Sequence, residues 1–85
     1  MSNITEQEIL QKLCAEIALI TRRPIENICP DAPLGENGID SMSFLELLIF
    51  IKKEWSIDFL SEGLSPSFLK DVNALAERIR EVLHS

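Results

Sequence analysis

The sequence predicts an all-helical domain, a small bundle of three main helices with a short helix or turn before the last of them. Apolar residues recur at the intervals of one helix face in three separate stretches. Each stretch follows a residue that favours a helix N-terminus. The 85 residues, 46% of them hydrophobic, suit a single small domain over residues 1–85 with one core.

The first helix should begin after Thr5 and end near residue 21. Thr5 and Glu8 can form a capping box, in which each side chain bonds a backbone N–H that the helix leaves free. Ile4 and Ile9 add a hydrophobic staple. Pro24 cannot continue the helix and sets its end. The predicted core face is Ile9, Leu13, Ile17 and Ile20.

Residues 21–39 should form a long connection. They include three prolines and two glycines, which disfavour a helix. The apolar residues that should hold this segment on the core are Ile25, Ile28, Leu34 and Ile39. We expect a long ordered loop with one short helical turn, because long connections in small domains usually have a purpose.

The second helix should have Asp40 as its N-cap and run to Glu54 or Trp55. A projection at about 100° per residue separates two stripes. The predicted core stripe is Phe44, Leu47, Leu48, Ile51 and Trp55. The outer stripe is Met42, Glu46, Ile49 and Lys53. This outer stripe is either a set of scattered surface residues, which are common, or a docking face for another protein.

The C-terminal part contains a weak and a strong helical signal. Residues 57–64 have apolar anchors without a sustained period, and predict only a short helix or turn. Asp71 can then cap a last helix. Its predicted core face is Val72, Leu75, Ala76, Ile79, Val82 and Leu83. We expect seven residues of the two helices to line a space between them: Phe44, Leu47, Leu48, Ile51, Val72, Leu75 and Ile79.

Charge and composition disfavour several functions. The net charge of −6 makes nucleic acids and anionic membranes poor partners. The single histidine, His84, is the penultimate residue, so neither a Ser-His-acid triad nor a multi-histidine metal site can be built. We expect no catalytic residue, no metal site and no enzymatic activity.

Cysteine usage and hydropathy indicate a cytoplasmic protein, which we expect to be a monomer. Cys14 and Cys29 have no metal-site spacing and are too few for a disulfide framework, and we expect Cys14 in the core. The N-terminal residues are acidic where a signal peptide is basic, and no apolar stretch is long enough to insert into a membrane.

The main functional signal is the segment that leads into the second helix, Gly38-Ile-Asp-Ser-Met42. A serine in the first turn of a helix holds its hydroxyl in solvent, and the positive helix end favours an anion formed there. Taken alone, Ser41 fits better as a simple N-cap residue, with or without Asp40.

This segment and its surroundings resemble the acyl carrier protein family, in which the second helix opens with Gly-x-Asp-Ser-Leu or Asp-Ser-Met. The resemblance covers nearly the whole chain. Its other parts are Asp31-Ala-Pro-Leu34, Phe44-Leu-Glu-Leu-Leu48, Ile57-Asp58-Phe59 and Asp71-Val-Asn-Ala-Leu75. It implies a free-standing, acyl-carrier-like bundle that carries its cargo as a thioester on a 4′-phosphopantetheine arm, the cofactor, at Ser41.

The resemblance also implies the partners. A phosphopantetheinyl transferase would use Asp40 to bind and orient its metal and coenzyme A. Met42, Glu46 and Ile49 match positions that carriers present to other proteins, and Lys53 shares their stripe. The partners on this face would be acyl- or aminoacyl-loading enzymes and downstream transferases or synthases.

Two departures from fatty-acid carriers imply a specialised pathway. Ser43 and the pair Lys52-Lys53 stand where those carriers have acidic residues. We expect the lysines to weaken binding to generic fatty-acid enzymes, whose docking patches are basic. The cargo is open among fatty acid, polyketide and lipopolysaccharide acyl groups, and among aminoacyl or peptidyl groups of the D-alanyl or nonribosomal peptide type. The alternative from another class is an unmodified helical interaction module.

Overall fold

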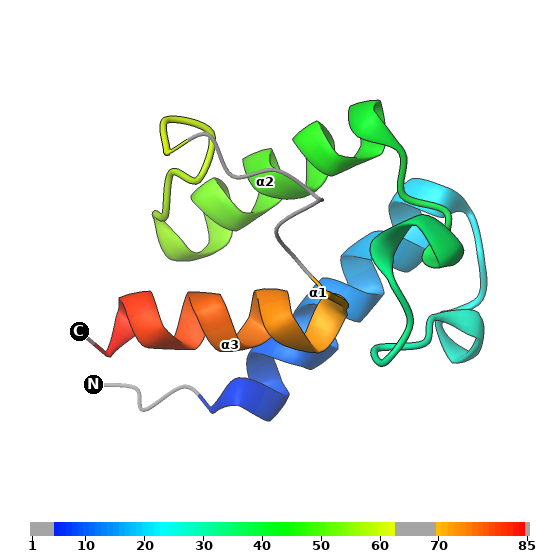
Figure 1. The fold of residues 1–85 in the computed structure, drawn as a ribbon, viewed down its shortest axis with the longest axis horizontal. Helices are drawn as coiled ribbons and strands as arrows, with labels where there is room; N and C mark the ends of the chain where they lie inside the picture. Colours follow the sequence, from blue (N-terminus) through cyan, green and yellow to red (C-terminus); the bar gives the residue numbers. More distant parts are fainter. Residues whose placement is uncertain (1–4, 63–69, 85) are drawn as a thin grey trace.

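The structure is a computed structural model that describes residues 5–62 and 70–84. The described residues form three α-helices and two short 3₁₀ helices and contain no strand (Figure 1). The elements are α1 (Glu6–Thr21), η1 (Ile25–Asn27), η2 (Leu34–Asn37), α2 (Ser41–Trp55) and α3 (Val72–Leu83). The prediction of a small all-helical domain is confirmed.

Helix α1 begins and ends where the sequence predicts. The Glu8 N–H donates to the Thr5 hydroxyl oxygen at 3.1 Å, and the Thr5 N–H donates to the Glu8 carboxylate at 3.1 Å. This is the predicted capping box, whereas Ile4 of the predicted staple lies outside the described residues. At the other end Arg22 takes a left-handed conformation, with φ of 60°, and turns the chain away before Pro24.

Helix α1 packs against both α2 and α3, and runs in the direction opposite to each of them (Figure 1). Among the described residues, the backbones of α2 and α3 are close to each other at far fewer points than either is to the backbone of α1. The predicted facing residues of α2 and α3 are buried in one core, but α1 contributes to that core as well. The expected two-helix space is therefore a three-helix core, and the buried face of α1 is Ile9, Leu13, Cys14 and Ile17.

The core stripes of α2 and α3 match the sequence prediction except at their ends. Trp55 is only partly buried and meets Phe50 edge to face, with 5.8 Å between ring centroids. Val82 is 39% exposed, because it lies at the edge of the buried face in the last turn of α3. The buried members are Phe44, Leu47, Leu48, Ile51, Val72, Leu75, Ala76 and Ile79.

The connection between α1 and α2 is ordered, as predicted, but contains two 3₁₀ helices where one short turn was expected. Ile28, Leu34 and Ile39 are buried, as predicted. Ile25 is wrong as an anchor, since it is half exposed at the start of η1, which buries none of its residues. The loop, the end of α1 and the beginning of α2 lie at the same end of the molecule (Figure 1).

The segment after α2 forms turns in its described part. Ser56 ends the helix with φ of 60°. Ile57 and Phe59 are buried, and the Asp58 carboxylate accepts hydrogen bonds from the Ser61 N–H and hydroxyl at 3.1 and 2.7 Å. Residues 57–62 thus form the predicted turn, while residues 63 and 64 lie outside the described residues.

Candidate functional site

Ser41 is the first residue of α2 and is exposed. The N-cap is Asp40, whose carboxylate accepts a hydrogen bond from the Ser43 N–H at 2.9 Å. Within the described part of the chain, the Ser41 hydroxyl has no hydrogen-bond partner. The helix end is capped without it, so the N-cap role falls to Asp40 alone.

Asp40 is an exposed carboxylate with a lowered pKa. The backbone N–H of Ser43 is the largest cause, because it donates to the ionised form, and the Ser43 hydroxyl adds to the effect. The residue beside Ser41 is thus anionic at neutral pH. Oxygen ligands of this kind suit a divalent cation such as Mg²⁺, although a single carboxylate is no metal site by itself.

The loop enters α2 through a backbone turn that requires glycine. Gly38 has φ of 91°, which is strained for any residue with a side chain. A Cβ here would also lie 3.1 Å from the guanidinium group of Arg23. That guanidinium crosses the turn and donates to the Glu36 carbonyl oxygen at 3.1 Å. Gly38 therefore has a conformational role and a packing role in the approach to Ser41.

Sequence reasoning missed Asn37, which lies just before this turn and is the only buried polar side chain among the described residues. Its side-chain oxygen accepts from the Cys29 N–H at 2.8 Å, and its amide group donates to the Cys29 carbonyl oxygen at 2.8 Å. The usable signal was a polar residue between two apolar anchors, Leu34 and Ile39, in an ordered loop.

The beginning of α3 holds the same loop from its other side. The Asn73 N–H donates to the Pro30 carbonyl oxygen at 3.2 Å, and the Asn73 side-chain amide donates to the Asp31 carboxylate at 2.6 Å. Asp71 caps α3 by accepting from the Ala74 N–H at 2.8 Å, as predicted. The loop that leads to the head of α2 is thus bonded by Arg23, which follows α1, and by Asn73 in the first turn of α3.

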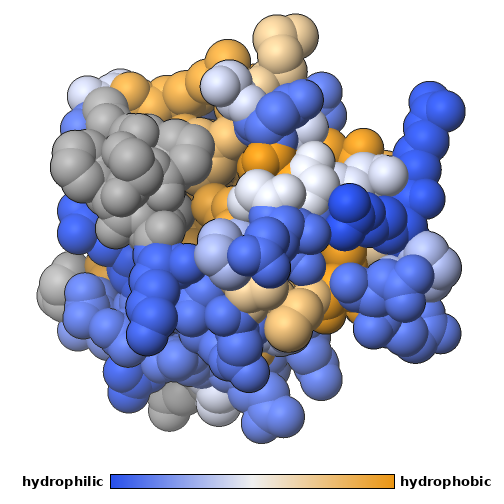
Figure 2. Space-filling view, turned by 45° about the vertical axis from the view of Figure 1, so that its right-hand side comes forward, coloured by the Kyte–Doolittle hydropathy of each residue, from blue (hydrophilic) through white to orange (hydrophobic). Residues whose placement is uncertain are grey.

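The predicted outer stripe of α2 faces solvent. Met42 is 72% exposed and Ile49 is 46% exposed, and Glu46 and Lys53 are exposed as well. Leu45, which the projection did not assign to this stripe, is about as exposed as Ile49 and enlarges the apolar area. Figure 2 shows apolar atoms along the upper part of the molecule, where α2 lies, and mostly hydrophilic atoms below.

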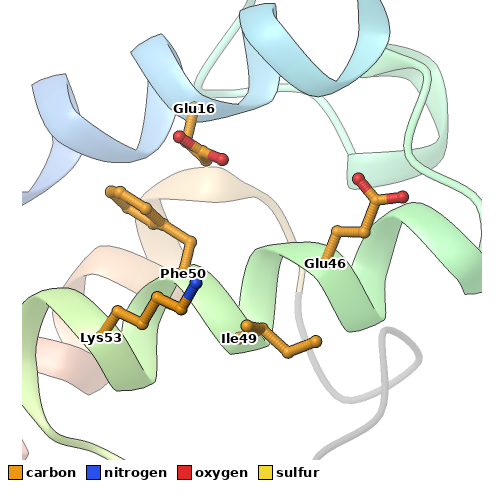
Figure 3. Close-up of a pocket in the computed structure, with 5 residues that line it drawn as sticks. All are labelled: Glu16, Glu46, Ile49, Phe50 and Lys53. Carbon is orange, nitrogen blue, oxygen red and sulfur yellow. The ribbon is translucent and has the colours of Figure 1, made fainter.

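An open groove of about 300 Å³ lies between α1 and α2 (Figure 3). Its lining residues are Glu16, Glu46, Ile49, Phe50 and Lys53. Glu16 projects from α1 toward α2, and the Phe50 ring projects toward α1. The structure thus brings Glu46, Ile49 and Lys53 together and adds Glu16, which the sequence did not indicate, while Met42 is not part of the groove lining.

The two lysines near the end of α2 have different surroundings. The Lys52 ammonium lies 3.7 Å from the Asp58 carboxylate. The pKa of Asp58 is lowered, mainly by hydrogen bonds from Ser61 and to a smaller extent by Lys52. Lys53 has no carboxylate within ion-pair distance in the described residues, and its side chain borders the groove.

Other kinds of site were sought in the same residues. The described ranges contain no group of three or more His, Cys, Asp or Glu side chains that could hold a metal ion. None of the helices described is both long and apolar enough to cross a membrane. Cys14 is buried, as predicted, and burial raises the pKa of its thiol, while Cys29 is an exposed free thiol.

Known proteins give no assignment for this chain. No protein-family model, no curated protein and no solved structure matches it. Any function assigned to the chain therefore depends on its own residues, chiefly those at the head of α2 and on the outer face of that helix.

Proposed function

We propose that the chain is an acyl carrier protein that carries a 4′-phosphopantetheine arm on Ser41. The observation that carries this proposal is the exposed Ser41 hydroxyl at the first residue of α2, directly after the N-cap Asp40. In the modification, the Ser41 oxygen forms a phosphodiester with the phosphate of coenzyme A that bears the pantetheine. The adenosine bisphosphate leaves, and the hydroxyl proton passes to a base of the transferase.

The local electrostatics support this chemistry. A phosphodiester at the first residue of a helix meets free backbone N–H groups and the positive end of the helix dipole. Asp40 keeps its negative charge beside the serine because its pKa is lowered. That carboxylate can therefore contribute an oxygen ligand to the magnesium ion of the transferase, as the resemblance to carriers implies.

The finer fold is part of the proposal. Three helices, joined between the first and second by a long ordered loop, are consistent with an acyl-carrier-like bundle. The short helix or turn expected over residues 57–64 is a turn in its described part, and residues 63 and 64 lie outside the described residues. On this basis we assign the chain to that fold.

The arm would bring a thioester-bound cargo to partner enzymes. Tethering gives each partner a high effective concentration of substrate, so the carrier needs no catalytic group of its own. The partners would be the transferase, a loading enzyme and downstream transferases or synthases, in the cytoplasm. Lys52 and Lys53 favour a specialised acyl pathway, and an aminoacyl or peptidyl cargo would use the same attachment at Ser41.

The exposed apolar residues Met42, Leu45 and Ile49 support a docking role for the outer face of α2, together with Glu46 and Lys53. The same residues also suit a second candidate function, an unmodified interaction module. The two functions differ in the fate of Ser41.

Intact-mass spectrometry separates the two. The chain is incubated with coenzyme A, magnesium and a promiscuous phosphopantetheinyl transferase, and its mass should rise by one arm. Ser41→Ala should gain nothing, whereas Ser43→Ala, which changes a serine two residues away, should be modified like the parent. No mass gain in the folded parent would favour the interaction module.

A further inference from the structure

The amide side chain of Asn37 is 1% exposed, yet the loop before α2 satisfies all of its hydrogen-bonding groups. Its oxygen accepts from the Cys29 N–H at 2.8 Å. Its nitrogen donates to the carbonyl oxygens of Cys29, Ala32 and Pro33 at 2.8, 3.4 and 3.3 Å. One side chain therefore joins three residues of the loop, and its bonds to Cys29 hold that residue at both its N–H and its carbonyl group.

An apolar side chain could not replace these bonds. The Cys29 and Pro33 carbonyl oxygens also accept from backbone N–H groups within the loop, but the Cys29 N–H and the Ala32 carbonyl oxygen bond the Asn37 side chain. An apolar side chain at position 37 would remove these partners, and loss of a hydrogen bond at a largely buried site is destabilising. The nearby bonds from the Gly38 N–H to the Gly35 carbonyl and from the Ile39 N–H to the Leu34 carbonyl, both 3.0 Å, close the loop only near its end. The link back to Cys29, eight residues earlier, depends on Asn37.

The backbone runs directly from Asn37 to the head of α2. Gly38 has a fixed left-handed turn, braced by the Arg23 guanidinium, and Ile39 is buried. Asp40 follows at once and bonds the Ser43 N–H. The backbone between Asn37 and Ser41 therefore has little conformational freedom.

The residues that Asn37 holds are also connected to α3. Cys29 precedes Pro30, whose carbonyl oxygen accepts from the Asn73 N–H, and Asp31 accepts from the Asn73 side chain. The loop segment 29–31 is thus bonded to Asn37 on the approach to α2 and to Asn73 in the first turn of α3.

We propose that Asn37 is a positioning residue for Ser41: through the loop it fixes the direction in which the head of α2 presents the serine hydroxyl. The inference rests on the proposed modification of Ser41. The Asn37 side chain has no hydrogen bond to Ser41 or to the outer face of α2 among the described residues. Its loss should therefore affect the transfer step and leave docking intact.

The test compares Asn37→Ala with Thr5→Ala. The control removes the capping box of α1, at the opposite end of that helix from the loop, and lowers stability by another route. The kcat and KM for each carrier with the transferase are measured at a temperature at which all variants are folded. For Asn37→Ala we expect kcat to fall about tenfold or more with KM within about twofold, because small misplacements of a reacting group are costly. The control should match the parent.

Equal kcat values for Asn37→Ala and the parent would overturn the positioning role. A parent that takes up no arm would instead refute the proposed function. Amide exchange of the Ser43 N–H, followed by NMR, tests the positioning role without the transferase. It should be faster in Asn37→Ala and unchanged in Thr5→Ala, and unchanged exchange in both would overturn the role. If Asn37→Ala does not fold, Asn37→Ser, which keeps a smaller polar group, takes its place in both measurements.

Discussion

The Asp40 carboxylate accepts a hydrogen bond from the Ser43 N–H at 2.9 Å and so caps α2 across the exposed residue Ser41. Two adjacent side chains at the helix end therefore have separate surroundings. One is bonded to the helix, and the other is free for chemistry in solvent. Substitution of each of the two residues by alanine tests this separation.

Ser41→Ala should leave the fold intact. The cap is made by Asp40. Substitution of an exposed side chain that makes no hydrogen bond changes the free energy of unfolding by no more than about 0.5 kcal/mol. The free energy of unfolding, from urea denaturation followed by circular dichroism, should match that of the parent. A large loss of stability would show that the Ser41 hydroxyl supports the helix end, and a retained mass gain in the modification assay would move the attachment site elsewhere.

Asp40→Ala should lower the midpoint of thermal unfolding at neutral pH, because the Ser43 N–H loses its acceptor. The hydrogen bond lowers the pKa of Asp40 below its ordinary value of 3.8 in the folded state. Its ionic contribution to stability is therefore fully present well above pH 3.8 and is lost as the pH falls through the lower folded-state pKa.

The difference between the parent and Asp40→Ala isolates this residue, since the other carboxylates titrate in both proteins. Unfolding midpoints measured from pH 7 to below the pKa of Asp40 should converge as the pH falls. A difference that stays constant over the whole range would mean that the charge of Asp40 contributes nothing to the cap.

The helix boundaries could be predicted because their causes are local. Thr5 with Glu8, Asp40 and Asp71 each bond a backbone group three residues away, and such spacing is visible in a sequence. The buried stripes of the helices follow in the same way from a regular period. The prediction that Val82 lies in the core is wrong, because helical periodicity does not show where a neighbouring helix stops covering the apolar face.

The features that could not be predicted from the sequence depend on contacts between distant segments or within segments that have no regular period. Asn37 bonds residues four to eight positions earlier in a loop without regular spacing, so its burial could not be read from periodicity. Glu16 shares a groove with Glu46 and Phe50 only because α1 packs against α2 in one particular register. Ser41 could be proposed from the sequence without any such contact, since the motif that contains it is contiguous.

Leu48→Ala should destabilise the protein by about 2–5 kcal/mol, because it removes a fully buried side chain and leaves a cavity. Ile49→Ala is the matched control, one residue further along α2 and 46% exposed, and should cost much less. Urea denaturation measures both. Equal losses for the two variants would contradict the assignment of the inner and outer faces of α2.

Lys53→Glu should improve recognition of the carrier by fatty-acid enzymes, if the chain is the carrier that we propose. Lys53 borders the groove with Glu16 and Glu46 and has no ion-pair partner in the described residues. Enzymes that present basic patches to acidic carriers would meet a like charge there, and such a contact weakens a wrong complex. Lys52 is the matched control, because it lies 3.7 Å from Asp58.

Transfer of a malonyl group from a fatty-acid acyltransferase to each modified carrier, measured at two ionic strengths, provides the test. At low salt Lys53→Glu should raise the rate about two- to fivefold, the size expected for one exposed charge pair. The gain should shrink at higher salt, since exposed charges are screened over about 10 Å at 0.1 M. Lys52→Glu should change the rate less. Equal rates for the parent and Lys53→Glu at low salt, with a lower unfolding midpoint for the variant, would mean that Lys53 only complements the dipole at the end of α2.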